Sequence, residues 1–98
     1  MNTILKSLEF DAWLIGLKDI IVKAQVIARI RNAQIGNFGD HVPVGSGVYE
    51  MRIHVGPGHR VYYTRTDNVV YFLLLGGTKK SQQRDIDNAI AMAKAMKE

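Results

Sequence analysis

The sequence predicts an α+β fold, because the residue pattern at its two ends is typical of helices and the pattern in its middle is typical of strands. Apolar residues recur at the spacing of amphipathic helices in residues 10–30 and again in residues 86–96. Between these segments, glycines and both prolines of the chain separate short strand-like runs. With 98 residues, of which 47% are hydrophobic and 22% charged, the chain can build one core, so we expect a single domain over residues 1–98.

The first expected elements are a short strand at Ile4 and Leu5, followed by two helices. Ser7 suits the N-cap of the first helix, because its hydroxyl can accept a hydrogen bond from a backbone amide. The inward stripe of this helix is expected to consist of Phe10, Trp13, Leu14 and Leu17. A second helix is predicted to begin near Asp19 and end at Gly36, which readily takes a left-handed conformation. Its expected inward residues are Ile20, Ala24, Ile27 and Ile30.

Two amphipathic strands are predicted on either side of the turn Gly56-Pro57-Gly58, at residues 48–55 and 59–65. A three-residue loop would pair Val55 with His59 and place the apolar side chains on one face. The opposite face would then carry Glu50, Arg52, His54, Arg60, Tyr62 and Thr64. A shift of the pairing by one residue would turn the arginines into the core, and the cost of burying unpaired charge argues against that shift.

A third strand at residues 69–75 and a final helix complete the predicted order. The strand is apolar on both faces, so we expect it inside the sheet with both faces at least partly covered. Asp67-Asn68 is expected to form a two-residue turn that sets Tyr63 across from Phe72. Ser81 is expected to cap the last helix. The inward residues of that helix are expected to be Ile86, Ala89, Ile90, Ala93 and Met96.

Positive charge is concentrated in the second half of the chain. Residues 52–84 contain six basic residues and one acidic residue, whereas residues 1–51 contain five of each. The six basic residues are Arg52, Arg60, Arg65, Lys79, Lys80 and Arg84. With a net charge of +4, this local field favours a polyanionic partner such as nucleic acid or the ribosome, or an acidic protein, over a membrane surface.

Several classes of site do not fit the sequence. The chain has no cysteine, which excludes disulfides and zinc-thiolate sites, and its histidines, His41, His54 and His59, are not expected to converge. We therefore predict no metal and no other cofactor. No apolar run reaches the roughly 18 to 20 residues that span a bilayer. Because the N-terminus also lacks the plan of a signal peptide, we expect the protein in the cytoplasm.

The remaining groups suit cleavage of RNA without a metal. The 2′-hydroxyl of RNA attacks the neighbouring phosphate, so a protein needs to align the reacting atoms, neutralise the phosphorane and move protons. Arg52, Arg60 and Lys79 are the candidate phosphate clamp, because a guanidinium matches phosphate oxygens and stays protonated. His54, expected across from Arg60, is the candidate acid or base, with an inert surface histidine as the alternative of equal weight.

Three further residues are candidates for binding RNA. Tyr62 offers a ring on which a base can stack, although a cross-strand aromatic that shields the sheet is an equally good interpretation. Lys80 and Arg84 follow the last strand and add positive charge beside the proposed clamp.

Several motifs, spread over residues 10–86, occur together in this chain. They are Phe10-Asp11-Ala12-Trp13-Leu14, Gly36-Asn37-Phe38-Gly39-Asp40, Tyr49-Glu50-Met51-Arg52-Ile53, Gly56-Pro57-Gly58-His59-Arg60-Val61-Tyr62-Tyr63 and Leu73-Leu74-Leu75-Gly76-Gly77 ahead of Lys79. In this combination the chain resembles the phage Gp49-like, HigB-type addiction-module killer proteins of the RelE/ParE toxin superfamily. The resemblance implies a RelE-like fold, with an N-terminal helical hairpin and a C-terminal helix packed around a curved, mainly antiparallel sheet of about four strands.

The resemblance also implies a function. It suggests the toxin of a bacterial type II toxin–antitoxin module, held inactive by a cognate antitoxin that we expect to be a helix-turn-helix protein encoded beside it. RelE- and HigB-type toxins cleave mRNA on translating ribosomes, and Arg52, Arg60 and Lys79 match the positions of their basic residues. The expected activity is therefore that of an mRNA interferase, a metal-independent endoribonuclease that inhibits translation, with the ribosome and mRNA as partners.

Two alternatives stay open from the sequence. One is a ParE-like inhibitor of DNA gyrase without catalysis, and the other is a degenerate toxin that retains only antitoxin binding. RelE-type nucleases often carry a tyrosine or histidine at the start of the final helix, where this chain reads Gln82-Gln83-Arg84-Asp85. The sequence therefore leaves the general acid unassigned.

Overall fold

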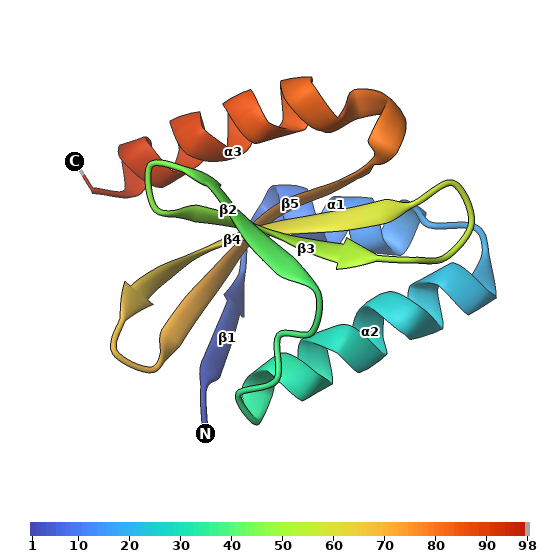
Figure 1. The fold of residues 1–98 in the computed structure, drawn as a ribbon, viewed down its shortest axis with the longest axis horizontal. Helices are drawn as coiled ribbons and strands as arrows, with labels where there is room; N and C mark the ends of the chain where they lie inside the picture. The colour runs from blue at the N-terminus through green and yellow to red at the C-terminus, as the bar shows by residue number, and fades with distance from the viewer. Residues whose placement is uncertain (98) are drawn as a thin grey trace.

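Residues 1–97 are described by a computed structural model, in which a five-stranded sheet lies between two layers of helices (Figure 1). The elements in chain order are β1 (Thr3–Lys6), α1 (Leu8–Gly16), α2 (Ile20–Gln34), β2 (His41–Gly45), β3 (Val48–Ile53), β4 (His59–Asp67), β5 (Val70–Thr78), a short 3₁₀ turn η1 (Lys79–Ser81) and α3 (Gln82–Met96). The predicted α+β class, with two helices near the N-terminus and one at the C-terminal end, is confirmed.

The sheet is mixed and has the strand order β1-β5-β4-β3-β2. β1 pairs in parallel with β5, and the other neighbours are antiparallel. The expectation of about four strands is thus one short, because residues 41–45 form the edge strand β2, which contains Pro43. Proline has no amide hydrogen to donate, so an edge strand tolerates it better than a central one.

The two N-terminal helices begin where the sequence predicts. The Ser7 hydroxyl accepts a hydrogen bond from the amide of Phe10 at 2.9 Å, and the Asp19 carboxylate accepts one from the amide of Ile21 at 2.9 Å. The predicted inward stripe of α2 is wrong in part: Ile30 packs against the core, but the helix docks mainly through other residues. Its buried residues are Val22, Val26 and Ala33, whereas Ile20 and Ala24 are exposed. Both stripes are apolar, so their spacing alone does not show which one faces the sheet.

The β3–β4 hairpin has the predicted faces but not the predicted pairing. Met51 lies opposite Val61 and Arg52 lies opposite Arg60, a shift of two residues that lengthens the connecting loop to residues 54–58. A shift by an even number leaves every side chain on its expected face. It does change neighbours, so Arg52 faces Arg60 instead of Tyr62.

The β4–β5 hairpin differs from the prediction in its faces. Its turn lies at residues 68–69, one position later than expected, and Tyr63 pairs with Leu73 instead of Phe72. Leu73 consequently packs on the α1–α2 side, while Phe72 and Leu74 pack on the α3 side. Two register irregularities along β4 break the strict alternation on which the prediction depended.

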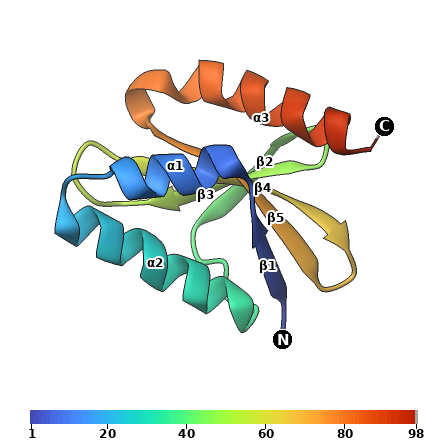
Figure 2. The same cartoon turned by 180° about the vertical axis from the view of Figure 1, so that it is seen from behind.

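Each face of the sheet has its own hydrophobic core. α1 and α2 cover one face, and α3 covers the other (Figure 2). The first core contains Phe10, Val22, Val26, Ala33, Met51, Ile53, Val61, Tyr63 and Leu73. The second contains Val48, Tyr62, Leu74, Ala89 and Ala93. In the part of the chain from 1 to 97, no helix is both long and apolar enough to span a membrane.

Adjacent glycines let both helical layers approach β5 closely. A Cβ atom on Gly76 would overlap the ring of Trp13 from α1, and a Cβ atom on Gly77 would overlap the carboxylate of Asp85 from α3. Glycine is therefore required at both positions for steric reasons, one for each face of the sheet.

Candidate functional site

The centre of the candidate site is a carboxylate that lies on β3 beneath the start of α3. Glu50 is 0% exposed. Its Oε1 accepts a hydrogen bond from Nε of Arg52 at 3.0 Å, and its Oε2 accepts from the Tyr62 hydroxyl at 3.2 Å and from Nε2 of Gln82 at 2.9 Å. Nε of Arg60 lies 3.5 Å from the same Oε2. Four side chains from β3, β4 and α3 thus meet at one buried acid.

These donors keep the buried acid ionised. Burial acts to raise the pKa of the Glu50 carboxyl, but hydrogen bonds from Arg52, Gln82 and Tyr62 together hold that pKa below its usual value. Burial and the nearby charge of Glu50 raise the pKa of the Tyr62 phenol. Tyr62 therefore remains protonated and acts as a donor to the carboxylate.

The two arginines of the candidate clamp are brought together as the sequence predicts, and they differ in exposure. The Arg52 side chain is 39% exposed and that of Arg60 is 13% exposed. Within residues 1–97, the buried Nε of Arg60 has no hydrogen-bond partner. Together with Glu50, the pair carries a net charge of +1, and guanidinium N–H groups beyond the two Nε atoms remain to bind an anion.

Lys79 lies next to Arg60 through the loop of the β3–β4 hairpin. Its amide donates a hydrogen bond to the carbonyl of Gly58 at 3.0 Å. A Cβ atom on Gly58 would lie 3.5 Å from Nη1 of Arg60 and 3.9 Å from Cβ of Lys79, so both residues border this glycine. The turn after β5 therefore delivers Lys79 to the edge of the arginine pair.

His54 does not lie across from Arg60, and that prediction is wrong. Because the hairpin loop is longer than expected, His54 falls in the loop and is exposed. Its Nε2 is 2.6 Å from Oδ2 of Asp40, and this hydrogen bond is the main cause that lowers the pKa of the Asp40 carboxyl. The Asp40 carbonyl accepts from the amide of Arg52 at 2.9 Å, which attaches the His54–Asp40 pair to the outer side of Arg52.

The prediction that Tyr62 offers a stacking surface is also wrong. The ring is fully buried in the core under α3, and its hydroxyl is used by Glu50. A base has no access to it. The alternative interpretation, an aromatic that shields the sheet, fits the structure.

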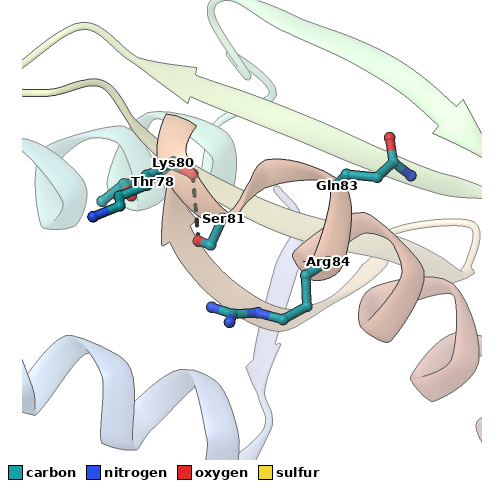
Figure 3. Close-up of a pocket in the computed structure, with 5 residues that line it drawn as sticks. All are labelled: Thr78, Lys80, Ser81, Gln83 and Arg84. Atoms are coloured by element: carbon teal, nitrogen blue, oxygen red, sulfur yellow. Dashed lines mark hydrogen bonds between the residues drawn. The ribbon is translucent and has the colours of Figure 1, made fainter.

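Lys80 and Arg84 border an open pocket at the start of α3, with a volume of about 450 Å³ (Figure 3). Figure 3 shows their side chains on the opposite side of the turn from Gln83. Ser81 occupies the N-cap position, but its hydroxyl contacts the Thr78 carbonyl at 3.5 Å and the Asp85 carboxylate at 2.5 Å instead of capping an amide. Basic side chains beside a helix N-terminus favour an anion, which suits the predicted RNA-binding role.

Sequence reasoning missed Glu50, Gln82 and Asp40 as members of the site. The spacing of Glu50 and Arg52 does place both on one face of a strand, which was a usable signal. The contribution of Gln82 depends on where α3 lies over the sheet, and no local pattern reports that.

Comparison with known proteins identifies a relative that matches nearly the whole chain. No family model matches the chain. An uncharacterized protein of Haemophilus influenzae (strain ATCC 51907 / DSM 11121 / KW20 / Rd) is 43% identical over 90 residues, which cover 92% of this chain and 91% of that protein. The chain belongs to the same family as this protein. The relationship extends over nearly the whole fold, so the family shares the architecture described above.

Proposed function

We propose that the protein is the toxin of a bacterial type II toxin–antitoxin module and acts as an mRNA interferase, cleaving mRNA on translating ribosomes without a metal. The observation that carries the proposal is the grouping of Arg52 and Arg60 on one buried carboxylate, with Lys79 beside Arg60. The same three residues match the basic positions of RelE- and HigB-type toxins, and a RelE-like arrangement of helices and sheet is part of the proposal.

The proposed chemistry assigns the basic residues to the phosphate. Arg52 and Arg60 bind the non-bridging oxygens of the scissile phosphate and neutralise the charge that develops on the phosphorane. Lys79 adds a third cation, and Lys80 and Arg84 bind the RNA backbone next to the site. The 2′-hydroxyl of the substrate attacks the neighbouring phosphorus and the P–O5′ bond breaks, so the upstream product ends in a 2′,3′-cyclic phosphate and the downstream product begins with a 5′-hydroxyl.

In this proposal the ribosome aligns the 2′-hydroxyl, the phosphate and the leaving oxygen of the mRNA. The protein imposes no in-line geometry on a flexible RNA, and alignment of reacting atoms is worth several kcal/mol. We therefore expect poor cleavage of free RNA and efficient cleavage in the ribosomal decoding site. The reaction should persist in EDTA once polyamines hold the ribosomes intact.

The decisive experiment is the growth arrest of cells that express Arg60→Ala. Loss of one such electrostatic group lowers a rate on the order of 10² to 10³-fold, so arrest should disappear while thermal unfolding of the purified variant stays cooperative. Arg31→Ala, an exposed arginine on α2, is the matched control and should retain full toxicity. Undiminished toxicity of a well-folded Arg60→Ala protein would refute the proposed site.

One observation favours the second candidate, a ParE-like gyrase inhibitor without catalysis or a degenerate toxin. His54, the predicted acid or base, bonds Asp40 away from Arg60, and the hydroxyl of the buried Tyr62 bonds Glu50, so neither side chain is placed to transfer a proton to RNA next to Arg60. The two candidates differ in their first effect in cells. If DNA-damage signalling precedes any loss of mRNA after induction, the gyrase candidate replaces the nuclease.

The proposed partner is an antitoxin, expected to be a helix-turn-helix protein encoded in the neighbouring reading frame. Two surfaces suit it: the basic residues around η1 and the exposed apolar side chains of the helical hairpin. The latter include Leu8, Ile15, Ile20 and Ile21. An association rate that falls with rising salt would place an acidic antitoxin on the basic surface. A rate insensitive to salt would place the antitoxin on the helices.

A further inference from the structure

We propose that Glu50 is a positioning residue, which fixes the guanidinium groups of Arg52 and Arg60 for phosphate and joins them to the start of α3. The inference rests on the proposed function and gives a role to Glu50, which is not among the basic residues assigned to the phosphate. It follows from the contacts of the carboxylate, the pairing of the strands and the link to the helix.

The contacts exclude direct chemistry by the carboxylate in this arrangement. Glu50 is fully buried, and both of its oxygens already accept hydrogen bonds from Arg52, Tyr62 and Gln82. A general base must come within hydrogen-bond reach of the substrate proton, which a carboxylate with no exposed surface does not. Glu50 has no path to RNA, so any effect on the reaction must pass through its partners.

The strand pairing explains why the arginines need an acid between them. Arg52 and Arg60 are directly opposite each other on β3 and β4, and like charges in such a pair repel. The Glu50 carboxylate contacts the Nε side of both guanidiniums and offsets this repulsion. Contact through Nε also restricts the rotamers of the long side chains and leaves their terminal N–H groups for phosphate oxygens.

A hydrogen bond from Gln82 also connects the Glu50 carboxylate to the start of α3, next to the end of β5. Gln82 is the first residue of α3, and its amide reaches Oε2 of Glu50 at 2.9 Å. Lys79 precedes it by one turn of η1. The carboxylate thus sets the sheet arginines and the turn that carries Lys79 relative to each other.

The test compares Glu50→Gln with Thr64→Val. Glutamine keeps the size of the side chain but removes its charge. Thr64 is a matched control, because it is buried on β4 on the same face and bonds the carbonyl of Gly47 instead of an arginine. We expect Glu50→Gln to lower kcat/KM for cleavage of ribosome-bound mRNA about 10 to 100-fold, and Thr64→Val to change it less than about 2-fold.

A double-mutant cycle separates positioning from general destabilisation. In an Arg60→Ala background, Glu50→Gln should lower the residual rate by a smaller factor than in the wild-type background, because one of the two arginines through which it acts is already absent. A merely structural role would give the same loss in both backgrounds. Equal losses would therefore overturn the inference.

A second readout does not depend on catalysis. In the folded wild-type protein, NMR should detect slowly exchanging Nε–H signals of Arg52 and Arg60, and Glu50→Gln should broaden them or speed their exchange. If wild type cleaves no mRNA, the proposed function fails and this measurement still decides the role of Glu50. If Glu50→Gln does not fold, Glu50→Asp carries the same test, since it keeps the charge but withdraws the carboxylate. Unchanged arginine signals in a folded variant would overturn the inference.

Discussion

The two faces of the sheet are built differently. The face under α1 and α2 is closed by apolar and aromatic side chains, among them Phe10, Met51 and Leu73. The face under α3 combines a smaller hydrophobic core, which includes Val48, Leu74 and Ala89, with an ionised carboxylate and its donors, centred on Glu50. Apolar burial stabilises a fold directly, whereas a buried ion pair often contributes little net stability. The larger apolar core of the first face should therefore contribute more to stability, whereas the second face adds a network that holds charges in place.

Neighbouring tyrosines on β4 illustrate this contrast. Tyr62 points to the α3 face and donates its hydroxyl to Glu50. Tyr63 points to the other face, where its ring stacks between Phe38 at 5.1 Å and Tyr49 at 5.5 Å. Adjacent residues with the same side chain thus serve an ionic network in one case and an aromatic core in the other.

The largest effect should come from truncating the apolar face. Phe10 is fully buried against the sheet, so Phe10→Ala should lower the free energy of unfolding by about 3 to 5 kcal/mol. Urea denaturation measures this change. Leu8→Ala on the same helix is the control, because Leu8 is 85% exposed and should change stability by less than about 0.5 kcal/mol. Similar values for both variants would contradict the packing of α1.

The glycine pair on β5 allows both faces to be tested with one chemical change. Gly76→Ala meets Trp13 and Gly77→Ala meets Asp85, and each should cost about 1 to 3 kcal/mol of unfolding free energy through overpacking. Asp85→Ala removes the obstructing carboxylate. It should relieve much of the cost of Gly77→Ala and leave that of Gly76→Ala unchanged.

Thermal or chemical unfolding of the single and double variants measures these costs. Relief of Gly77→Ala alone would show that the two glycines contact different faces of the fold. If Asp85→Ala relieved both substitutions equally, the separation of Trp13 and Asp85 onto opposite faces would be wrong.

Alkaline pH should weaken both faces through their buried phenols. Burial is the main cause that raises the pKa of Tyr62 and of Tyr63. In the unfolded chain each phenol ionises near its usual pKa of about 10. Stability is therefore complete below pH 10 and is lost as the pH rises above it, by up to about 1.4 kcal/mol per pH unit for each phenol. Urea midpoints at pH 9 and pH 11 measure the loss, and a stability that rises over this range would contradict it.

Removing each phenol separately should distinguish the faces at neutral pH. Tyr62→Phe deletes a donor to a buried carboxylate and should cost about 0.5 to 1.5 kcal/mol or more. Tyr63→Phe keeps the ring contacts to Phe38 and Tyr49 and should cost less than about 0.5 kcal/mol. The two variants are controls for each other in the same unfolding assay. The reverse order would mean that the ionic network does not depend on Tyr62.

The sequence was sufficient for most features whose determining contact is local. The Ser7 cap and the start of α2 near Asp19 were predicted correctly, because a cap bonds amides two or three residues away. The predicted cap Ser81 is the exception, since its hydroxyl bonds Asp85 instead. The faces of β3 and β4 were also predicted, since placing Arg52 in the apolar core would have cost unpaired buried charge. The same argument correctly predicted that Arg52 and Arg60 lie on one face of the sheet.

The sequence was insufficient where two packings satisfy the same pattern. α2 has two apolar stripes, so the burial of Val22 instead of Ile20 depends on how the helix docks. The fate of His54 depended on the length of the hairpin loop, which moved it from Arg60 to Asp40. The burial of Tyr62 depends on α3, which covers a face that the local pattern showed as open. Long-range packing decided each of these cases.

The smallest effect should come from the exposed edge of the ionic face, where His54 bonds Asp40. This hydrogen bond is the leading cause of the lowered pKa of the Asp40 carboxyl. In His54→Gln, NMR titration of the carboxyl carbon should therefore show the Asp40 pKa rising toward its usual value of about 4. A carboxyl whose pKa is lowered in the folded state stabilises the fold at pH values above its pKa in the unfolded chain. This stabilisation is lost as the pH falls through the pKa of the folded state. Because both side chains are exposed and screened, the variant should unfold like wild type at pH 7. An unchanged Asp40 pKa would show that the neighbouring arginines, and not His54, control this carboxylate.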